Sequence, residues 1–340
     1  MTSSFDANQR LVISLGDPAG IGMEVVLKAL ASPDLPATMR PLLVGCRRCL
    51  SATYTQLRSE GCTTLADPDR LEVLDQPLNP VITPGTPSAV SGAASFQWLT
   101  ESVRCLADSG GRALVTAPIA KHLWHAAGHS YPGQTERLAE LAHQRRSSML
   151  FTAVSPHTGW RLNTLLATTH IPLKEVSAAL TPELVEHKLN VLLNFCRRFR
   201  SQPRLTVAGL NPHAGEEGKI GDEEAGWLSP LLRKWRAAHP GIQLDGPLPP
   251  DTCWLKAAQA WNHHSGQPSS PDGILALYHD QGLIPVKLLA FDAAVNTTLE
   301  LPFLRTSPDH GTGFDIAGQG LARPDSMIAA IQAAWELSET

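Results

Sequence analysis

Three short apolar runs in this chain are typical of buried strands, and each run leads to a histidine. Residues 162–169 precede His170, residues 204–210 precede the Asn-Pro-His that contains His213, and residues 273–278 precede His279. The segments that follow are rich in the turn-forming residues Gly, Pro, Asp and Asn. The carboxyl ends of strands in an α/β sheet face one shared crevice. We therefore expect the three imidazoles to form a divalent-metal site with positions left open for substrate.

Similar runs alternate with segments of helical spacing along the rest of the chain, which favours α/β layers. Further strands are expected at residues 11–15, 41–45, 71–74, 113–116, 148–154, 286–290 and 294–298. Helices are expected at residues 88–107, 135–143, 184–199, 227–238 and 325–336. Thr181 and Pro182 have the residue types of an N-cap and a first helical position. The Pro-rich segment 245–252 is expected to be a loop.

Length and composition narrow the class of protein. A chain of 340 residues is too long for one small core, so two domains are expected. The net charge of −4 gives no general attraction to nucleic acid. No apolar run approaches the roughly 20 residues of a membrane-spanning helix, and residues 1–10 lack the apolar core of a signal peptide. We expect a cytoplasmic protein with a small-molecule substrate and no membrane or nucleic-acid partner.

The cysteines do not indicate a disulfide framework. There are six in the chain, and only Cys46 and Cys49 have Cys-x-x-Cys spacing. Without a second pair, a four-cysteine zinc site is not expected, and incidental thiols are favoured over a redox pair.

Four motifs lie in order along the second half of the chain. They are Asn-Pro-His-Ala-Gly-Glu at 211–216, Gly-Pro-Leu-Pro-Pro-Asp-Thr at 246–252, Tyr-His-Asp-Gln-Gly at 278–282 and Arg-Thr-Ser-Pro-Asp-His-Gly-Thr at 305–312. Together they resemble the 4-hydroxythreonine-4-phosphate dehydrogenase family, NAD-dependent enzymes of pyridoxal phosphate biosynthesis. The resemblance extends from about residue 11 to the C-terminal helix.

The resemblance implies an α/β fold like that of isocitrate and isopropylmalate dehydrogenases. Such a fold has two α/β/α domains with an interdomain active-site cleft. The first domain, on the cofactor side, is expected at residues 1–130 plus 300–340. The second, at residues 131–299, is expected to carry the metal ligands and the dimer interface. The family relationship further implies a homodimer whose active site is shared between the subunits.

The resemblance also assigns site residues. Its metal ligands match His170, His213 and His279, the same three that strand ends indicate. Its substrate-binding positions match a set from both halves of the chain, namely Gln134, Thr135, Lys287, Asn296 and Arg305. Residues 309–320 are similar to the adenosine-binding loop of isopropylmalate dehydrogenases. This similarity implies a cofactor role for His310, Gly311, Thr312 and Asp315.

One substrate position departs from the family pattern. Many members have His-Thr-Glu where this chain has Gln134, Thr135 and Glu136. An amide can hydrogen-bond a substrate, but it carries no charge and does not shuttle a proton near neutral pH. We favour a purely binding role for this position over a shifted substrate.

The activity implied is an oxidation and decarboxylation of 4-phosphooxy-L-threonine to 3-amino-2-oxopropyl phosphate, with NAD or NADP as oxidant. One divalent metal per site is expected. Three imidazoles suit zinc or cobalt, and oxygen donors from the substrate would also admit magnesium. Asp251 and Lys287 are candidates for the general base. Asp280 is placed to orient an imidazole or a metal-bound water.

Three other functions stay open at this point. A dehydrogenase of the same fold could act on 4-phosphothreonate or 4-phosphoerythronate, and Gln134 keeps that alternative open. A phosphate acyltransferase has a related layered fold but needs no metal. A non-catalytic metal-binding protein would have no use for the Gly-rich loop at 309–320.

Overall fold

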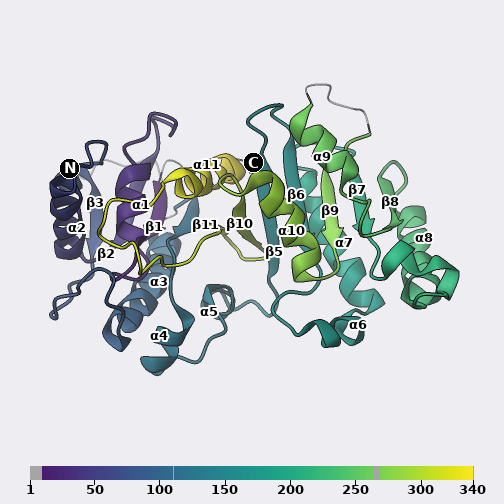
Figure 1. The fold of residues 1–340 in the computed structure, drawn as a ribbon, viewed down its shortest axis with the longest axis horizontal. Helices are drawn as coiled ribbons and strands as arrows, with labels where there is room; N and C mark the ends of the chain where they lie inside the picture. Colours follow the sequence, from purple (N-terminus) through teal and green to yellow (C-terminus); the bar gives the residue numbers. More distant parts are fainter. Residues whose placement is uncertain (1–9, 110, 264–268, 340) are drawn as a thin grey trace. The chain divides into compact units, whose positions relative to one another are not determined.

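The computed structural model describes residues 10–109, 111–263 and 269–339, and the chain forms two compact units. The first unit comprises the chain up to Ser147 and again from Val295, and the second is Ser148–Ala294 (Figure 1). The divisions predicted from the sequence are at residues 130 and 300. Helix α5 (Gln134–Leu141), predicted to lie in the second domain, belongs to the first unit.

The first unit is built on a mostly parallel sheet. Its strands are β1 (Arg10–Ser14), β2 (Arg40–Gly45), β3 (Glu72–Asp75), β4 (Ala113–Thr116), β10 (Val295–Leu299) and β11 (Leu304–Pro308). They run in the order β3-β2-β1-β4-β11-β10, and only β10 is antiparallel to its neighbour. The centre of this sheet is apolar on both faces, as in parallel sheets covered by helices on both sides.

Helices cover this sheet. They are α1 (Gly22–Ala29), α2 (Arg47–Ser59), α3 (Ala89–Ser109), α4 (Lys121–Ala126), α5 and α11 (Asp325–Glu339). Helix α3 packs on β1, β2 and β4, and α11 packs on β4, β10 and β11. The Thr306 hydroxyl of β11 donates to the Ala330 carbonyl of α11 at 2.8 Å. Because side chains alternate along a strand, the neighbouring Arg305 points to the opposite face of the sheet.

The second unit places the three predicted histidine-bearing strands side by side. Its strands are β5 (Ser148–Val154), β6 (Arg161–Leu166), β7 (Arg204–Ala208), β8 (Gln243–Leu248) and β9 (Gly273–Ala276). Their order is β5-β6-β9-β7-β8, and only β5 runs antiparallel to its neighbour. The carboxyl ends of β6, β9 and β7 therefore meet at one edge, which confirms the expected arrangement of the strands.

Helices lie on both faces of the second sheet. They are α6 (Val176–Ala179), α7 (Pro182–Cys196), α8 (Ser229–Ala238), α9 (Leu255–Asn262) and α10 (His279–Ala290). Ile274 and Ala276 of β9 share a buried cluster with residues of α9 and α10. A Cβ on the alternate residue Gly273 would lie 2.8 Å from Leu192 of α7, on the other face. A Cβ on Gly282 would lie 2.5 Å from the Leu166 side chain, so only glycine lets α10 lie this close to the sheet.

Two local predictions need correction and one is confirmed. The strand predicted at residues 286–290 is wrong, since these residues belong to α10. Leu283, Val286 and Ala290 are buried at helical spacing, although Pro285 interrupts the sequence pattern. Part of the predicted loop 245–252 is strand β8, at the edge of the sheet, where proline is tolerated. As predicted, the Thr181 hydroxyl caps α7 by accepting from the Leu184 amide at 3.2 Å.

None of the helices in the described part of the chain is both long and apolar enough to cross a membrane.

Candidate functional site

Two of the three predicted metal ligands come together within one chain. His170 lies beyond the end of β6, and His279 is the first residue of α10 after β9. Their ring centroids are 5.5 Å apart and their planes are inclined by 45°. With Zn–N distances near 2.0–2.1 Å, two tetrahedral imidazole ligands have centroids roughly 5.2 Å apart. The observed spacing therefore suits two ligands of one ion.

The orientation of His279 is fixed by its neighbour. Its Nδ1 lies 2.7 Å from a carboxylate oxygen of Asp280. That bond leaves Nε2 as the nitrogen available to a metal. The contact fits the orienting role expected for Asp280.

His213 lies in an unusual turn after β7. Residues 213–217 all have positive φ, from 45° to 79°, so the chain makes a left-handed turn in which only Gly215 is a glycine. Such backbone costs about 1–2 kcal/mol per non-glycine residue and requires support from elsewhere. The buried Glu224 supplies it, since one carboxylate oxygen accepts from the amides of Leu210 and Asn211 at 2.7 and 2.8 Å.

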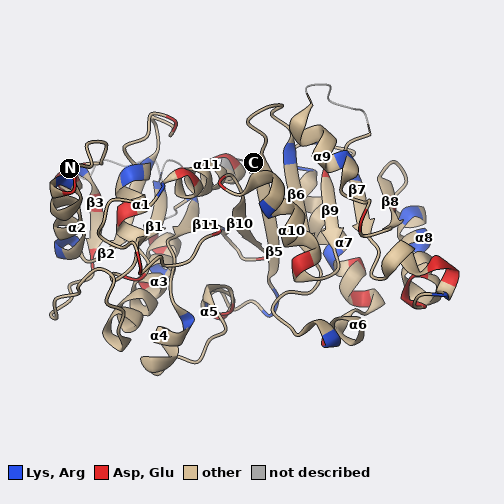
Figure 2. Ribbon diagram, in the orientation of Figure 1, with Lys and Arg blue, Asp and Glu red and all other residues tan. Residues whose placement is uncertain are grey.

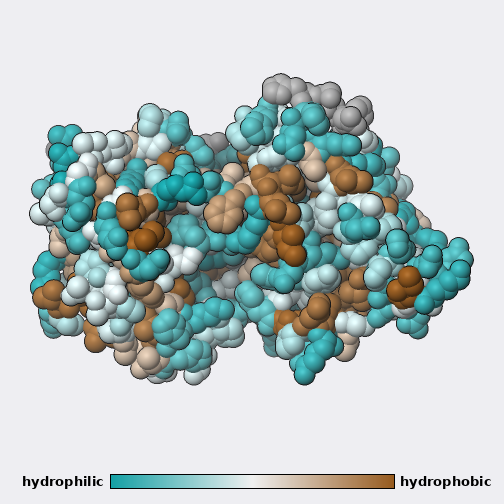
Figure 3. Space-filling model, in the orientation of Figure 1, coloured by the Kyte–Doolittle hydropathy of each residue, from teal (hydrophilic) through white to brown (hydrophobic). Residues whose placement is uncertain are grey.

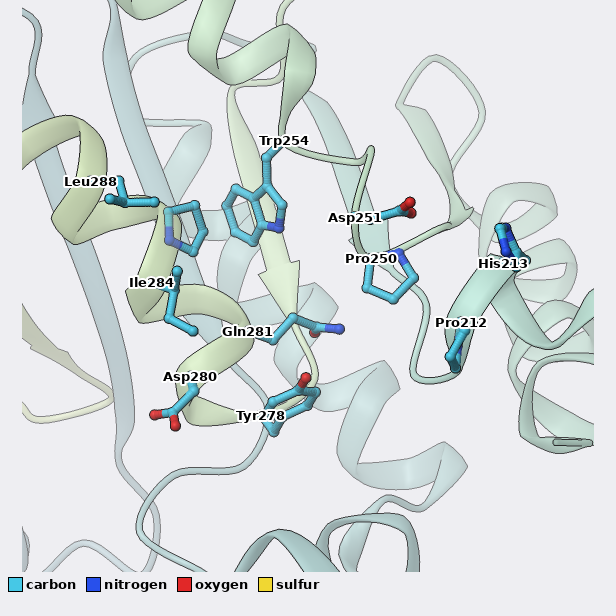
Figure 4. A pocket seen from close by; sticks show the side chains of 11 residues that line it. Pro212, His213, Pro250, Asp251, Trp254, Tyr278, Asp280, Gln281, Ile284 and Leu288 are labelled. Carbon is cyan, nitrogen blue, oxygen red and sulfur yellow. The ribbon is translucent and has the colours of Figure 1, made fainter. Parts of the chain in front are cut away.

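His213 does not join the other two histidines within a single chain. Over the described ranges, no three His, Cys, Asp or Glu side chains lie close enough together to hold a metal ion. His213 instead borders a pocket of about 470 Å³ that extends to Asp280 (Figure 4). The pocket is lined by Pro212, His213, Pro250, Asp251, Trp254, Tyr278, Asp280, Gln281, Ile284, Pro285 and Leu288.

The two candidate bases differ in their surroundings. Asp251 lines this pocket, across from the α10 residues in Figure 4. Lys287 is exposed on α10 and is not a lining residue; its Nζ lies 5.9 Å from the centre of the Phe291 ring. The sequence had given no role to Trp254, because nothing in its local pattern separates it from a core residue.

Acidic side chains surround the His213 turn. Glu216, Glu217 and Asp222 are exposed in the segment between β7 and α8, which is marked red in Figure 2. Their negative charge raises the local concentration of cations near His213.

A second polar cluster lies in the first unit, around Arg305 of β11. The Arg305 side chain is buried, and its guanidinium donates to the hydroxyls of Thr116 and Thr298 at 2.6–3.2 Å. Burial lowers its pKa to about 10, while the charge of Glu136 opposes that shift. A buried cation that hydrogen-bonds to hydroxyls is favourable only if an anion offsets its desolvation. The cluster therefore suits a phosphate or a carboxylate.

Three of the predicted ligand-binding side chains carry buried polar atoms without a hydrogen-bond partner. These atoms are Oε1 of Gln134, Oδ1 of Asn296 and Nε2 of His310. The Gln134 amide nitrogen already donates to the Ala117 carbonyl at 3.3 Å, so the oxygen is its free atom. Buried polar atoms normally find partners, and an unmet one costs about 1–3 kcal/mol. Their coincidence with predicted positions fits a site whose ligand supplies the missing bonds.

Gln134 and Thr135 also begin helix α5. The first amides of a helix have no partner within the helix, and the helix dipole favours an anion there.

The predicted cofactor loop is fixed at its inner side. The Thr312 carbonyl accepts from the Ile21 amide at 2.9 Å, and the Gly318 carbonyl accepts from the Gln56 side chain at 2.9 Å. Lys28 donates to the carbonyls of Gly320 and Ala322 at 2.8 and 2.7 Å. Gly311 and Asp315 are exposed, and a Cβ on Gly311 would meet nothing within 4 Å. The loop thus presents an open outer side, as nucleotide binding requires.

Comparisons with known proteins agree with this description. The family model described as pyridoxal phosphate biosynthetic protein PdxA matches residues 37–334. A 4-hydroxythreonine-4-phosphate dehydrogenase from Synechococcus sp. (strain RCC307) is 64% identical over 328 residues, 96% of this chain and 99% of the relative. A D-threonate 4-phosphate dehydrogenase from Pectobacterium atrosepticum is 37% identical over 341 residues, 96% of this chain and 99% of the relative.

Solved structures show the same fold. A 4-hydroxythreonine-4-phosphate dehydrogenase from Klebsiella pneumoniae superposes with a TM-score of 0.79 at 35% identity, covering 97% of this chain and 99% of that one. A β-decarboxylating dehydrogenase from Thermococcus kodakarensis, at 13% identity and a TM-score of 0.51, covers 96% of this chain and 83% of that one, and shares the fold. The expected fold of the isocitrate and isopropylmalate dehydrogenase type is confirmed. With most of its length matched by the family model and by relatives of high identity, this chain belongs to the PdxA family of pyridoxal phosphate biosynthetic proteins.

Proposed function

We propose that the chain oxidises 4-phosphooxy-L-threonine with NAD or NADP and releases CO2, giving 3-amino-2-oxopropyl phosphate. Relatives named 4-hydroxythreonine-4-phosphate dehydrogenase, 64% and 55% identical over nearly the whole chain, support this activity. The single observation that carries the proposal is the His170–His279 pair, with ring centroids 5.5 Å apart at the carboxyl edge of a parallel sheet.

The pair supplies two of the three expected protein ligands of a divalent-metal site. We infer that His213 of a second copy completes it, because a single chain does not bring the third imidazole to the pair. Zinc, cobalt or magnesium, once bound, would lower the pKa of a substrate hydroxyl and stabilise developing negative charge.

The first unit supplies the groups that bind substrate. Arg305 and the amino end of α5, with Gln134 and Thr135, offer positive potential for the phosphate or carboxylate. The oxygens of Gln134 and Asn296 are acceptors, so they suit the hydroxyl and ammonium of an amino alcohol. Lys287, an exposed cation on α10, is a further candidate for substrate binding.

Asp251 is the better candidate for the general base, because it lines the pocket that also contains His213. It would take the proton of the substrate hydroxyl, and NAD or NADP, once bound, would supply the hydride acceptor that this oxidation needs. The carbon–carbon bond to the carboxylate then breaks and CO2 leaves. The electron pair of that bond forms an enolate, which is protonated at the carbon that carried the carboxylate.

The cofactor would lie against residues 309–315. The groups available to a nucleotide are the unpaired Nε2 of His310, the exposed Gly311 and Asp315, and the half-buried Thr312. NAD is the family default, and NADP is the alternative.

A homodimer is supported by one face of α10. Ile284, Leu288 and Phe291 are 59%, 80% and 66% exposed, and they lie three or four residues apart on this helix. Figure 3 shows the resulting apolar patch over α10. An exposed apolar stripe of this kind is typical of a protein interface, which supports a dimer interface on the second unit.

The cytoplasmic location stays a prediction. The N-terminal segment on which it depends, residues 1–9, lies outside the described residues.

The alternative substrate is a phosphorylated sugar acid such as 4-phosphothreonate, as the name of the Pectobacterium relative indicates for that protein. NADH formation, followed at 340 nm, is measured with equal concentrations of 4-phosphooxy-L-threonine, 4-phosphothreonate and 4-phosphoerythronate. The comparison separates the proposed amino acid substrate from the two sugar acids. We expect the highest kcat/KM with the amino acid. A higher value with either sugar acid would replace the proposed substrate.

The metal requirement is tested by His213→Ala, with the exposed His157→Ala in the same unit as matched control. We expect His213→Ala to lose bound metal and at least a hundredfold in kcat, roughly the effect of removing an electrostatic stabiliser, while its fold survives. Full turnover of His213→Ala in metal-free buffer would disprove the role of the metal.

A further inference from the structure

One buried side-chain amide connects the turn that carries His213 with the first turn of α10, which carries His279. Gln281, in the first turn of α10, is 7% exposed. Its Oε1 accepts from the Leu277 amide at 2.7 Å, and its Nε2 donates to the Gly209 carbonyl at 2.6 Å. One partner is a donor and the other an acceptor, so the orientation of the amide is fixed.

The two partners of Gln281, Gly209 and Leu277, lie opposite each other if the pairing register of β7 and β9 is continued past the ends of these strands. β7 and β9 pair at Leu205–Gly273, Thr206–Ile274 and Val207–Leu275. Two residues further along each strand, the same register brings Gly209 opposite Leu277. At that point the side chain of Gln281 lies between the two strands, in place of a direct contact between their main chains. The strands therefore separate where the pocket of Figure 4 begins, and Gln281 is one of its lining residues.

The other hydrogen bonds of Leu277 and Gly209 further restrict the positions of these two strand ends. The Leu277 carbonyl accepts from the amide and the hydroxyl of Thr168, two residues before His170. The Gly209 amide donates to the Leu248 carbonyl of β8 at 2.6 Å. Beyond Gly209, Glu224 holds Leu210 and Asn211, and the His213 turn follows. Gln281 thus connects two hydrogen-bond networks. One supports the segments that carry His170 and His279, and the other supports the turn that carries His213.

We propose that Gln281 is a positioning residue that sets the separation of the β7 and β9 ends and thereby the placement of the metal-binding histidines. It touches no reacting atom in this role. The inference rests on the proposed metal-dependent function. Residues that orient metal ligands from behind typically change metal affinity by 10- to 100-fold when replaced.

The variant Gln281→Met tests this role, since methionine has a similar length and no donor or acceptor of comparable strength. Its matched control is Asn163→Leu, in the same unit. Asn163 is a buried amide that also makes two bonds, accepting from Thr152 and donating to the Asp272 carbonyl before β9 begins, at the opposite edge of the sheet. We expect both variants to lose stability, but only Gln281→Met to alter the strand ends that carry histidines.

Calorimetric titration of Co²⁺ into the metal-free full-length protein gives the decisive readout. We expect Gln281→Met to bind Co²⁺ 10- to 100-fold more weakly and Asn163→Leu to bind as the wild type does. Hydrogen exchange of the peptide containing Leu277 should accelerate in Gln281→Met alone. If Gln281→Met does not fold, Gln281→Asn, whose side chain is too short to reach both partners, is measured instead with the same expectation.

The outcomes separate this inference from the proposed function. If the wild type binds Co²⁺, His213→Ala does not, and Gln281→Met binds like the wild type, the positioning role is wrong and the metal site stands. If His213→Ala binds as tightly as the wild type, the proposed metal site itself is wrong, and the role of Gln281 falls with it.

Discussion

The two units hold their candidate binding groups in opposite ways. In the second unit, His170 and His213 are exposed, while the polar side chains that support the segments carrying the histidines, such as Gln281 and Glu224, are buried and hydrogen-bonded. In the first unit, Arg305 is buried, and Gln134 and Asn296 carry polar atoms that lack a partner.

The difference reflects what each unit binds. Exposure to water costs a neutral imidazole little metal-binding free energy. Several imidazoles can share one ion only in a fixed geometry, so the segments that carry them need rigid support. A guanidinium attracts an anion more strongly where water is excluded, at a cost in stability before the anion arrives. In the second unit, hydrogen bonds thus fix the positions of the metal-binding side chains. In the first unit, some polar atoms have no protein partner and are available to the substrate.

The largest expected effect comes from removing the buried charge. Arg305→Met should lower kcat/KM by at least about a hundredfold, because it removes a desolvated cation that binds an anion. The thermal midpoint should stay level or rise, because an apolar side chain of similar size replaces a buried charge. Steady-state kinetics and thermal unfolding are compared with Arg10→Met, which breaks a partly exposed surface pair with Glu72 and should leave activity unchanged. Retained activity in Arg305→Met would remove the anion-binding role.

The next effect concerns the exposed stripe of the second unit. Leu288→Glu should weaken the dimer at least about thirtyfold, as expected for an interface hot spot, and should lower activity at protein concentrations where monomers form. Sedimentation velocity measures the dissociation, with Val81→Glu, an equally exposed apolar site in the first unit, as control. An unchanged dimer in Leu288→Glu would place the interface elsewhere.

A smaller effect is expected at the free acceptor of the first unit. Gln134→Met should raise KM roughly tenfold with little change in kcat, because one buried hydrogen bond to the substrate is lost and no proton is carried. The control is Gln144→Met, which makes the same substitution at an exposed residue outside the candidate substrate site. A fall in kcat at constant KM would instead give Gln134 a role in the chemistry.

Sequence patterns were sufficient for the parts of the fold that depend on local spacing. The central strands, the capped helix α7 and the three strand ends with histidines follow from residue type and period, as at Thr181. The failures lie where local and tertiary signals conflict. Residues 286–290, which are apolar except for Lys287, follow Pro285 and fit a strand or a helix equally well. Packing against β6 and β9 decides for the helix.

The candidate site shows the same division. Histidines at strand ends can be identified from the chain alone, and Arg305 follows from its family motif. Glu224 and Gln281 could not be assigned a role, because their partners are main-chain groups of other segments that only folding brings near. The unpaired oxygens of Gln134 and Asn296 likewise depend on burial, which spacing does not report.

The smallest expected effect is a pH dependence of stability in the first unit. Burial raises the pKa of the Asp17 carboxyl above its ordinary value of 3.8, although the Ala19 amide and Ser91 oppose the shift. The folded state therefore binds this proton more tightly than the unfolded state, and stability falls as the pH rises through the folded pKa. Asp17→Asn should remove that decline. Urea unfolding from about pH 4 to pH 7 should show the variant gaining on the wild type as pH rises; a constant difference would contradict this.

The most direct test of the account counts imidazoles around one ion. Zinc K-edge X-ray absorption of the zinc-loaded protein should show three imidazole nitrogens at about 2.0–2.1 Å in the wild type, and two in His213→Ala. A wild-type spectrum with one imidazole or none, or a spectrum that His213→Ala leaves unchanged, would contradict a metal held jointly by His170, His213 and His279.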